Sequence, residues 1–116
     1  MHILSRAAPL AAIATLAIAA LAWGGGAHAD PDQNLVTIKN FDFHPMSITV
    51  PVGATVTWTN KDGEPHTVTS IDGTFRSDAL DQDDTFTFKF TKPGVYKYLC
   101  TIHPRMMASV TVKAGQ

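Results

Sequence analysis

The chain has 116 residues, with nine Lys and Arg against ten Asp and Glu, and its formal net charge is −1 with histidine neutral. This balance argues against a nucleic-acid partner, whose binding needs clustered basic residues. The single cysteine excludes an internal disulfide.

The N-terminal segment has the order of a secretory signal peptide. Arg6 precedes an Ala-, Leu- and Ile-rich run from Ala7 to Trp23, and the small-x-small sequence Ala27-His28-Ala29 follows. We therefore expect a signal peptide over residues 1–29, cleaved after Ala29, and export of residues 30–116 to the periplasm. The alternative is an uncleaved N-terminal anchor, because the run lies near the short limit for crossing a bilayer.

The expected mature chain is one small domain. It keeps eight Lys and Arg against ten Asp and Glu, so its net charge is −2 with histidine neutral. The core of a domain this small is marginal without a metal, a disulfide or a partner. In an oxidising compartment, a single cysteine forms an intermolecular disulfide, is exposed to damaging oxidation, or serves as a metal-bound or reactive thiol.

Alternation of apolar and polar residues predicts short strands along the whole mature chain. The segment 71–84 is irregular and acidic, and it reads as a solvated loop. No amphipathic helix and no internal repeat is evident. About seven short strands in one small domain favour an all-β fold, an antiparallel β-sandwich with Greek-key connections. The predicted strands are 35–39, 47–50, 54–60, 66–70, 85–90, 95–100 and 109–113.

Four soft or borderline donors stand out from this pattern. His66 follows one strand, and Cys100, His103 and either Met106 or Met107 lie between the last two strands. Zinc in structural sites takes Cys and His, and calcium and magnesium take oxygen, so a mixed set with a thioether fits neither. Two imidazoles and a thiolate in a trigonal plane with a weak axial methionine are the ligands of blue-copper electron-transfer sites.

The mature chain resembles the cupredoxins over essentially all of residues 35–113, and among them the amicyanins more than the pseudoazurins and plastocyanins. The resemblance rests on GATVTWTN with a histidine six residues after its Asn, on GVYKYLC, and on CTIHPRM. It implies one type 1 copper held by His66, Cys100, His103 and Met106, because amicyanin-like loops have the short Cys-x2-His-x2-Met spacing.

Two further residues take roles from the resemblance. The side chain of Asn60 is expected to hydrogen-bond across to the ligand loop and hold it beside Cys100. Ile102 stands where amicyanin-like loops usually have proline, and it restores a backbone N–H. If that N–H points at the Cys100 sulfur, it favours Cu(I) and raises the reduction potential relative to a proline variant.

The expected function is that of an exported, soluble carrier of single electrons, not an enzyme, because further copper sites would need more Cys and His than the chain has. The alternative is a copper delivery or sequestration protein without an electron-transfer role. We expect a monomer that meets its redox donor and acceptor briefly, with no nucleic-acid partner and no membrane insertion after cleavage. By resemblance, partners dock around His103 on an apolar patch of Pro65, Ile102, Pro104 and Met107.

Overall fold

The computed structural model describes residues 34–115, so the predicted signal peptide lies outside the described residues. Strands account for the regular structure of this range, and one predicted strand is much shorter than expected. The segment 66–70 forms a strand only over its last two residues, because the N–H of Val68 bonds to the Ser77 hydroxyl (2.8 Å) instead of to a neighbouring strand. The eight strands are β1 (Leu35–Lys39), β2 (Asp42–His44), β3 (Ser47–Pro51), β4 (Thr55–Asn60), β5 (Thr69–Ser70), β6 (Thr85–Lys89), β7 (Gly94–Leu99) and β8 (Met107–Lys113).

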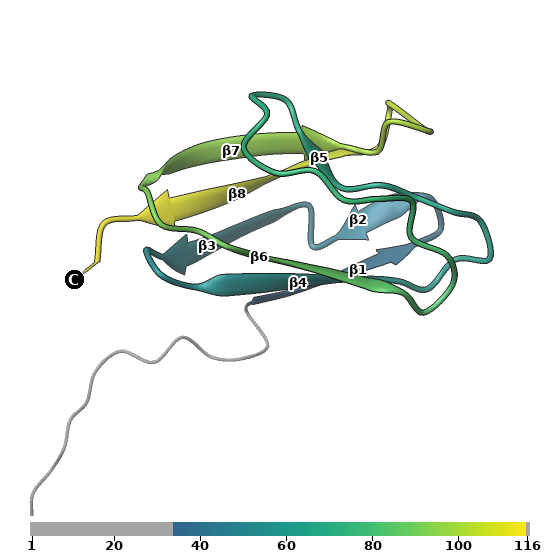
Figure 1. Ribbon diagram of the computed structural model, residues 1–116, viewed down its shortest axis with the longest axis horizontal. Helices are drawn as coiled ribbons and strands as arrows, with labels where there is room; N and C mark the ends of the chain where they lie inside the picture. The colour runs from purple at the N-terminus through teal and green to yellow at the C-terminus, as the bar shows by residue number, and fades with distance from the viewer. Residues whose placement is uncertain (1–33, 116) are drawn as a thin grey trace, which may run out of the picture.

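The strands form two four-stranded sheets, in the orders β2-β1-β4-β6 and β3-β8-β7-β5. The two sheets lie one above the other as the layers of a sandwich (Figure 1). The prediction of an all-β sandwich is confirmed, and its sheets are mixed rather than antiparallel throughout. The pair β1 and β4 is parallel, and so is the pair β3 and β8. Period-two alternation is the same in both kinds of sheet, so it does not distinguish them.

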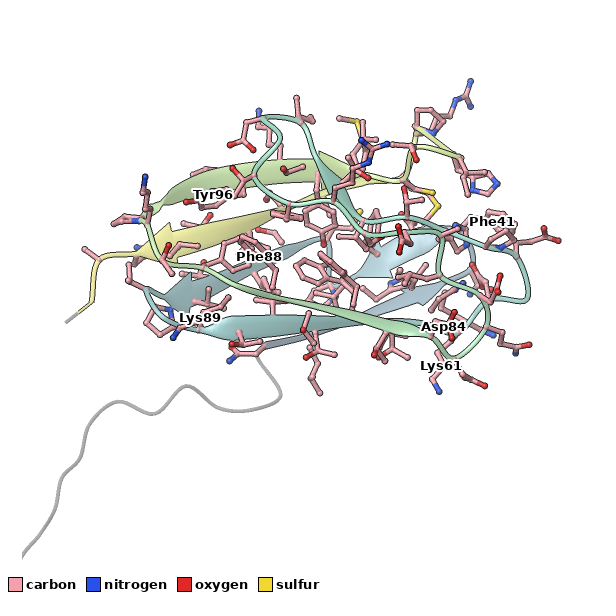
Figure 2. All side chains as sticks on the ribbon, viewed as in Figure 1. Phe41, Lys61, Asp84, Phe88, Lys89 and Tyr96 are labelled. Carbon is pink, nitrogen blue, oxygen red and sulfur yellow. The ribbon has the colours of Figure 1, made fainter. Side chains whose placement is uncertain are left out.

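The core lies between the sheets and is strongly aromatic. Trp58 of β4 and Tyr98 of β7 are both fully buried, with ring centroids 5.5 Å apart in an edge-on arrangement. Phe75 packs against both rings, and Phe88 points between the sheets toward it (Figure 2). The alternation of β7 continues into Cys100, which is therefore buried on the core side.

Three connections meet at one end of the sandwich: the β1–β2 turn, the β4–β5 connection and the β7–β8 connection (Figure 1). The β3–β4 and β6–β7 turns lie at the opposite end, where Gly53, with φ +95°, occupies the third position of a turn closed by Ala54 N–H on the Pro51 carbonyl (3.1 Å). The predicted donors belong to the first end. Among the described residues, no helix is long and apolar enough to cross a membrane.

Candidate metal centre

Three of the predicted donors come together from two separate connections. His66 forms an isolated antiparallel bridge with Leu80, with backbone bonds of 3.1 and 2.7 Å that fix its main chain. Cys100 follows the end of β7, and His103 lies in the next turn. His66 and Cys100 have no exposed surface, whereas His103 is half-buried. His103 is thus the one imidazole of the three groups with access to solvent.

The donor atoms converge on one centre. Sγ of Cys100 lies 3.7 Å from Nδ1 of His66 and 3.8 Å from Nδ1 of His103, and all three donor atoms lie within 4.8 Å of one another. Two metal–ligand bonds of about 2.0–2.3 Å that meet at about 120° place their outer atoms about 3.7 Å apart. The two Sγ–Nδ1 distances therefore fit three side chains around one ion.

Met106 closes the ligand loop. Its N–H donates to the His103 carbonyl (2.9 Å), and its carbonyl accepts the N–H of Cys100 (3.1 Å), so the loop folds back on its own first residue. The Met106 side chain is buried, at 3% exposure, whereas Met107 begins β8 and is 48% exposed. Its burial, together with its place in the closed ligand loop, favours Met106 over Met107 as a fourth ligand.

Thr67 joins the two ligand segments, which are the connection that carries His66 and the loop that carries Cys100 and His103. Its N–H donates to Sγ of Cys100 (3.3 Å), and its hydroxyl oxygen accepts the N–H of Thr101 (2.8 Å) and lies 2.8 Å from the Thr101 hydroxyl. Sequence reasoning missed this residue. Its position directly after a ligand histidine, with a hydroxyl, was the available signal.

The hydrogen bonds of Asn60 differ from those expected. Its Nδ2 donates to the carbonyls of Glu64 and Leu80, both at 2.8 Å, and its Oδ1 accepts the N–H of Asp62 (2.9 Å). Asn60 is fully buried and shapes the connection that carries His66. The bond across to the ligand loop, predicted for Asn60, is made by Thr67 instead.

Ile102 also differs from its expected role. Among the described residues, the amide that reaches Sγ of Cys100 is that of Thr67, and the N–H of Ile102 is not among the donors to this sulfur. The Ile102 side chain is 46% exposed. Its exposure supports a place on the surface around His103, alongside Pro104, which is exposed, and Pro65, which is half-buried.

The buried carboxylate of Asp62 lies next to His66, at the ring nitrogen that does not face Cys100. Oδ2 of Asp62 lies 2.9 Å from Nε2 of His66, within hydrogen-bond distance, and Asp62 is 7% exposed. The same carboxylate accepts the N–H groups of Asn40 (2.7 Å) and Phe41 (2.9 Å). Burial raises the pKa of Asp62, but these N–H groups and His66 outweigh it, so the pKa lies below its ordinary value. Sequence reasoning missed Asp62.

Phe41 packs on both imidazoles. Its ring lies edge-on to His66, with centroids 5.3 Å apart, and edge-on to His103, with centroids 5.0 Å apart. Figure 2 labels Phe41 at the end of the sandwich where the ligand loop lies. The ring is 47% exposed, so it adds apolar surface beside His103. A single phenylalanine in a turn carries no sequence signal for this contact.

Comparison with known proteins identifies the family of the chain. The family model of a cupredoxin-like domain matches residues 10–112. Amicyanin-alpha of Methylorubrum extorquens is 34% identical over 97% of this chain and 100% of its own length. Chloroplastic plastocyanin of Chlamydomonas reinhardtii is 31% identical over 81% of this chain and 73% of its own.

Solved structures with this fold include both small cupredoxins and a domain of a larger enzyme. A purple cupredoxin from Nitrosopumilus maritimus superposes with a TM-score of 0.65, at 36% identity, over 68% of this chain and 98% of its own. A copper-containing nitrite reductase from Thermus scotoductus has the same TM-score at 30% identity, but the match covers 22% of that chain. The fold therefore also occurs within larger enzymes, and the function has to be argued from the site.

Proposed function

Because the chain belongs to the family of cupredoxin-like domains, we propose that it is an exported, soluble carrier of single electrons with one type 1 copper. The observation that carries the proposal is the buried sulfur of Cys100, which lies close to the Nδ1 atoms of both His66 and His103. When bound, copper supplies a one-electron couple between Cu(II) and Cu(I). Cys100 would hold the ion as its anionic ligand, with His66, His103 and the thioether of Met106 as the neutral ones.

The protein holds these groups in place by bonds of its own. The N–H of Thr67 on Sγ, the bridge between His66 and Leu80, and the closed loop from Cys100 to Met106 fix the donors without a ligand between them. A site preorganised in this way needs little rearrangement when its charge changes. The buried positions of Cys100 and His66 also exclude water from the thiolate.

Electrons enter and leave through His103 in this proposal, because it is the ligand imidazole with access to solvent. The patch proposed for docking comprises Ile102, Pro104 and Met107, whose side chains are exposed, and the half-buried Pro65. A small apolar patch suits brief contacts with redox donor and acceptor proteins by a monomer. The signal-peptide pattern of residues 1–29 supports export to the periplasm.

The experiment uses the copper-loaded protein alone and measures electron self-exchange from NMR line broadening in mixtures of the two oxidation states. Pro104→Glu places like charges on two approaching patches, so the exchange rate should fall while the visible spectrum stays unchanged. Thr91→Glu adds the same charge in the β6–β7 turn at the opposite end and should leave the rate unchanged. An unaltered rate in Pro104→Glu removes Pro104 from the patch.

A second measurement separates electron transfer from copper delivery. An electron carrier keeps its copper through repeated oxidation and reduction. Release of the copper to a metal-free copper protein during those cycles would instead support delivery or sequestration.

A further inference from the structure

The Asp62 carboxylate connects two segments that the fold brings together from different parts of the chain. One is its own connection, in which His66 lies four residues later, and the other is the β1–β2 turn with Asn40 and Phe41. The carboxylate is 7% exposed, and Oδ2 serves both His66 and Phe41 while Oδ1 serves Asn40. An ionised carboxylate accepts hydrogen bonds and donates none, so all three partners must donate.

This requirement fixes the proton of His66. Since Nε2 must carry a hydrogen to bond Oδ2 at 2.9 Å, Nδ1 is left as the ring nitrogen that faces Sγ of Cys100 at 3.7 Å. A metal-binding imidazole presents one nitrogen, and a partner on the other nitrogen sets the ring orientation. Asp62 supplies that partner for the buried histidine.

The same carboxylate stabilises an unusual turn. Asn40 and Phe41 have φ values of 55° and 58°, in the left-handed region that residues other than glycine rarely adopt. Such conformations persist only where the surroundings hold them, and here the N–H groups of both residues bond to Asp62. The turn directs the Phe41 ring onto the edges of His66 and His103.

We propose that Asp62 is a positioning residue that holds the His66 imidazole and the Phe41 turn as one preassembled unit. Through Phe41 the unit also supports His103, so a single carboxylate orders both imidazoles. The inference rests on the proposed function, because it assigns the unit to metal binding, but its core is a property of the metal-free chain.

The first test uses the metal-free wild-type protein. Nitrogen-15 NMR of the imidazoles should show His66 protonated at Nε2, with a slowly exchanging ring proton, and the amides of Asn40 and Phe41 should be protected from hydrogen exchange. A His66 ring protonated at Nδ1 alone would overturn the proposal. This measurement needs no variant, so it stands even where a substitution prevents folding.

The second test uses Asp62→Asn, which keeps the size of the side chain and replaces one acceptor oxygen with a donor group. We expect loss of the slowly exchanging His66 proton, loss of amide protection at Asn40 and Phe41, and about 10–100-fold weaker binding of Cu(I) in a chelator competition. The matched control is Asp83→Asn, which removes an exposed carboxylate paired with Lys61 (3.0 Å) and should leave all three readouts unchanged.

A third variant, Phe41→Ala, separates the two halves of the unit. It retains the backbone N–H on Asp62, so the His66 proton should remain, while motion of the His103 ring should increase. Wild-type readouts in Asp62→Asn would refute the proposal. If instead the metal-free results hold and the protein binds no copper, the positioning role stands and the proposed function fails.

Discussion

The Thr67→Val substitution isolates the hydroxyl that joins the two ligand segments. Valine matches the shape of threonine and keeps the backbone N–H on Sγ of Cys100, so the change removes the hydroxyl contacts alone. Lost are the bond from the N–H of Thr101 and the contact with the Thr101 hydroxyl, both at 2.8 Å, and the longer bond from the Thr69 hydroxyl (3.4 Å). Thr67 is 7% exposed, so little water can reach its side chain to replace the lost hydrogen bonds.

A partly buried donor left without its acceptor costs about 1–3 kcal/mol. Thr101 itself is exposed, and water compensates part of this loss, so we expect Thr67→Val to lower the free energy of unfolding by about 1–2 kcal/mol. For a domain of this size each kcal/mol lowers Tm by about 4–8 °C.

Urea unfolding of the metal-free protein measures the effect, with an unchanged slope against urea as the sign of an unchanged denatured state. Thr67→Ser retains the hydroxyl and should lose less stability than Thr67→Val. Thr87→Val, on the exposed side of β6, should stay within about 0.5 kcal/mol of the wild type. Wild-type stability in Thr67→Val would show that the hydroxyl does not join the two segments.

Three further predictions concern the core and the ligand loop. Trp58→Ala removes the largest side chain of the core and should lower the free energy of unfolding, measured in urea, by about 3–5 kcal/mol. Val95→Ala, at a 62% exposed position, should leave it nearly unchanged. Equal effects would be inconsistent with the core described. Burial raises the pKa of Tyr98 above its usual 10.0, so the unfolded chain releases the phenol proton more readily than the folded one. The free energy of unfolding should therefore hold below about pH 10 and fall above it, by up to about 1.4 kcal/mol per pH unit. Tyr98→Phe should reduce that slope in alkaline urea titrations, and an unchanged slope would contradict the assignment. Ile102→Pro should leave the reduction potential nearly unchanged in voltammetry, because the Thr67 amide is the donor to the sulfur; a lower potential would return that role to Ile102.

The donors were predictable because the signal is local. Alternation along residues 95–100 placed Cys100 at the inward end of a strand, and the short spacing to His103 and Met106 put the next donors in the same turn. The order and direction of the strands in the sheets were harder to predict from the sequence. The parallel pairing of β1 with β4 depends on how the sheets close, and the three-residue β2 is too short to show a pattern.

The supporting residues escaped prediction for a different reason. Asp62 and Phe41 are 21 residues apart, and Thr67 and Cys100 are 33 apart, yet each pair is joined by a hydrogen bond. Nothing in the local sequence specifies these contacts, because they exist only after the sandwich brings the connections to one end. Asn60 was assigned a bond of this kind by resemblance, and the structure gives that bond to Thr67.

The central claim is that Cys100, His66 and His103 together bind copper as a thiolate centre, and the visible absorption spectrum after addition of Cu(II) to the metal-free protein tests it most directly. The account predicts an intense charge-transfer band from thiolate to copper that reaches its limit at one copper per chain and is absent in Cys100→Ser. A colourless protein that binds zinc in preference to copper, or a band that persists in Cys100→Ser, would contradict it.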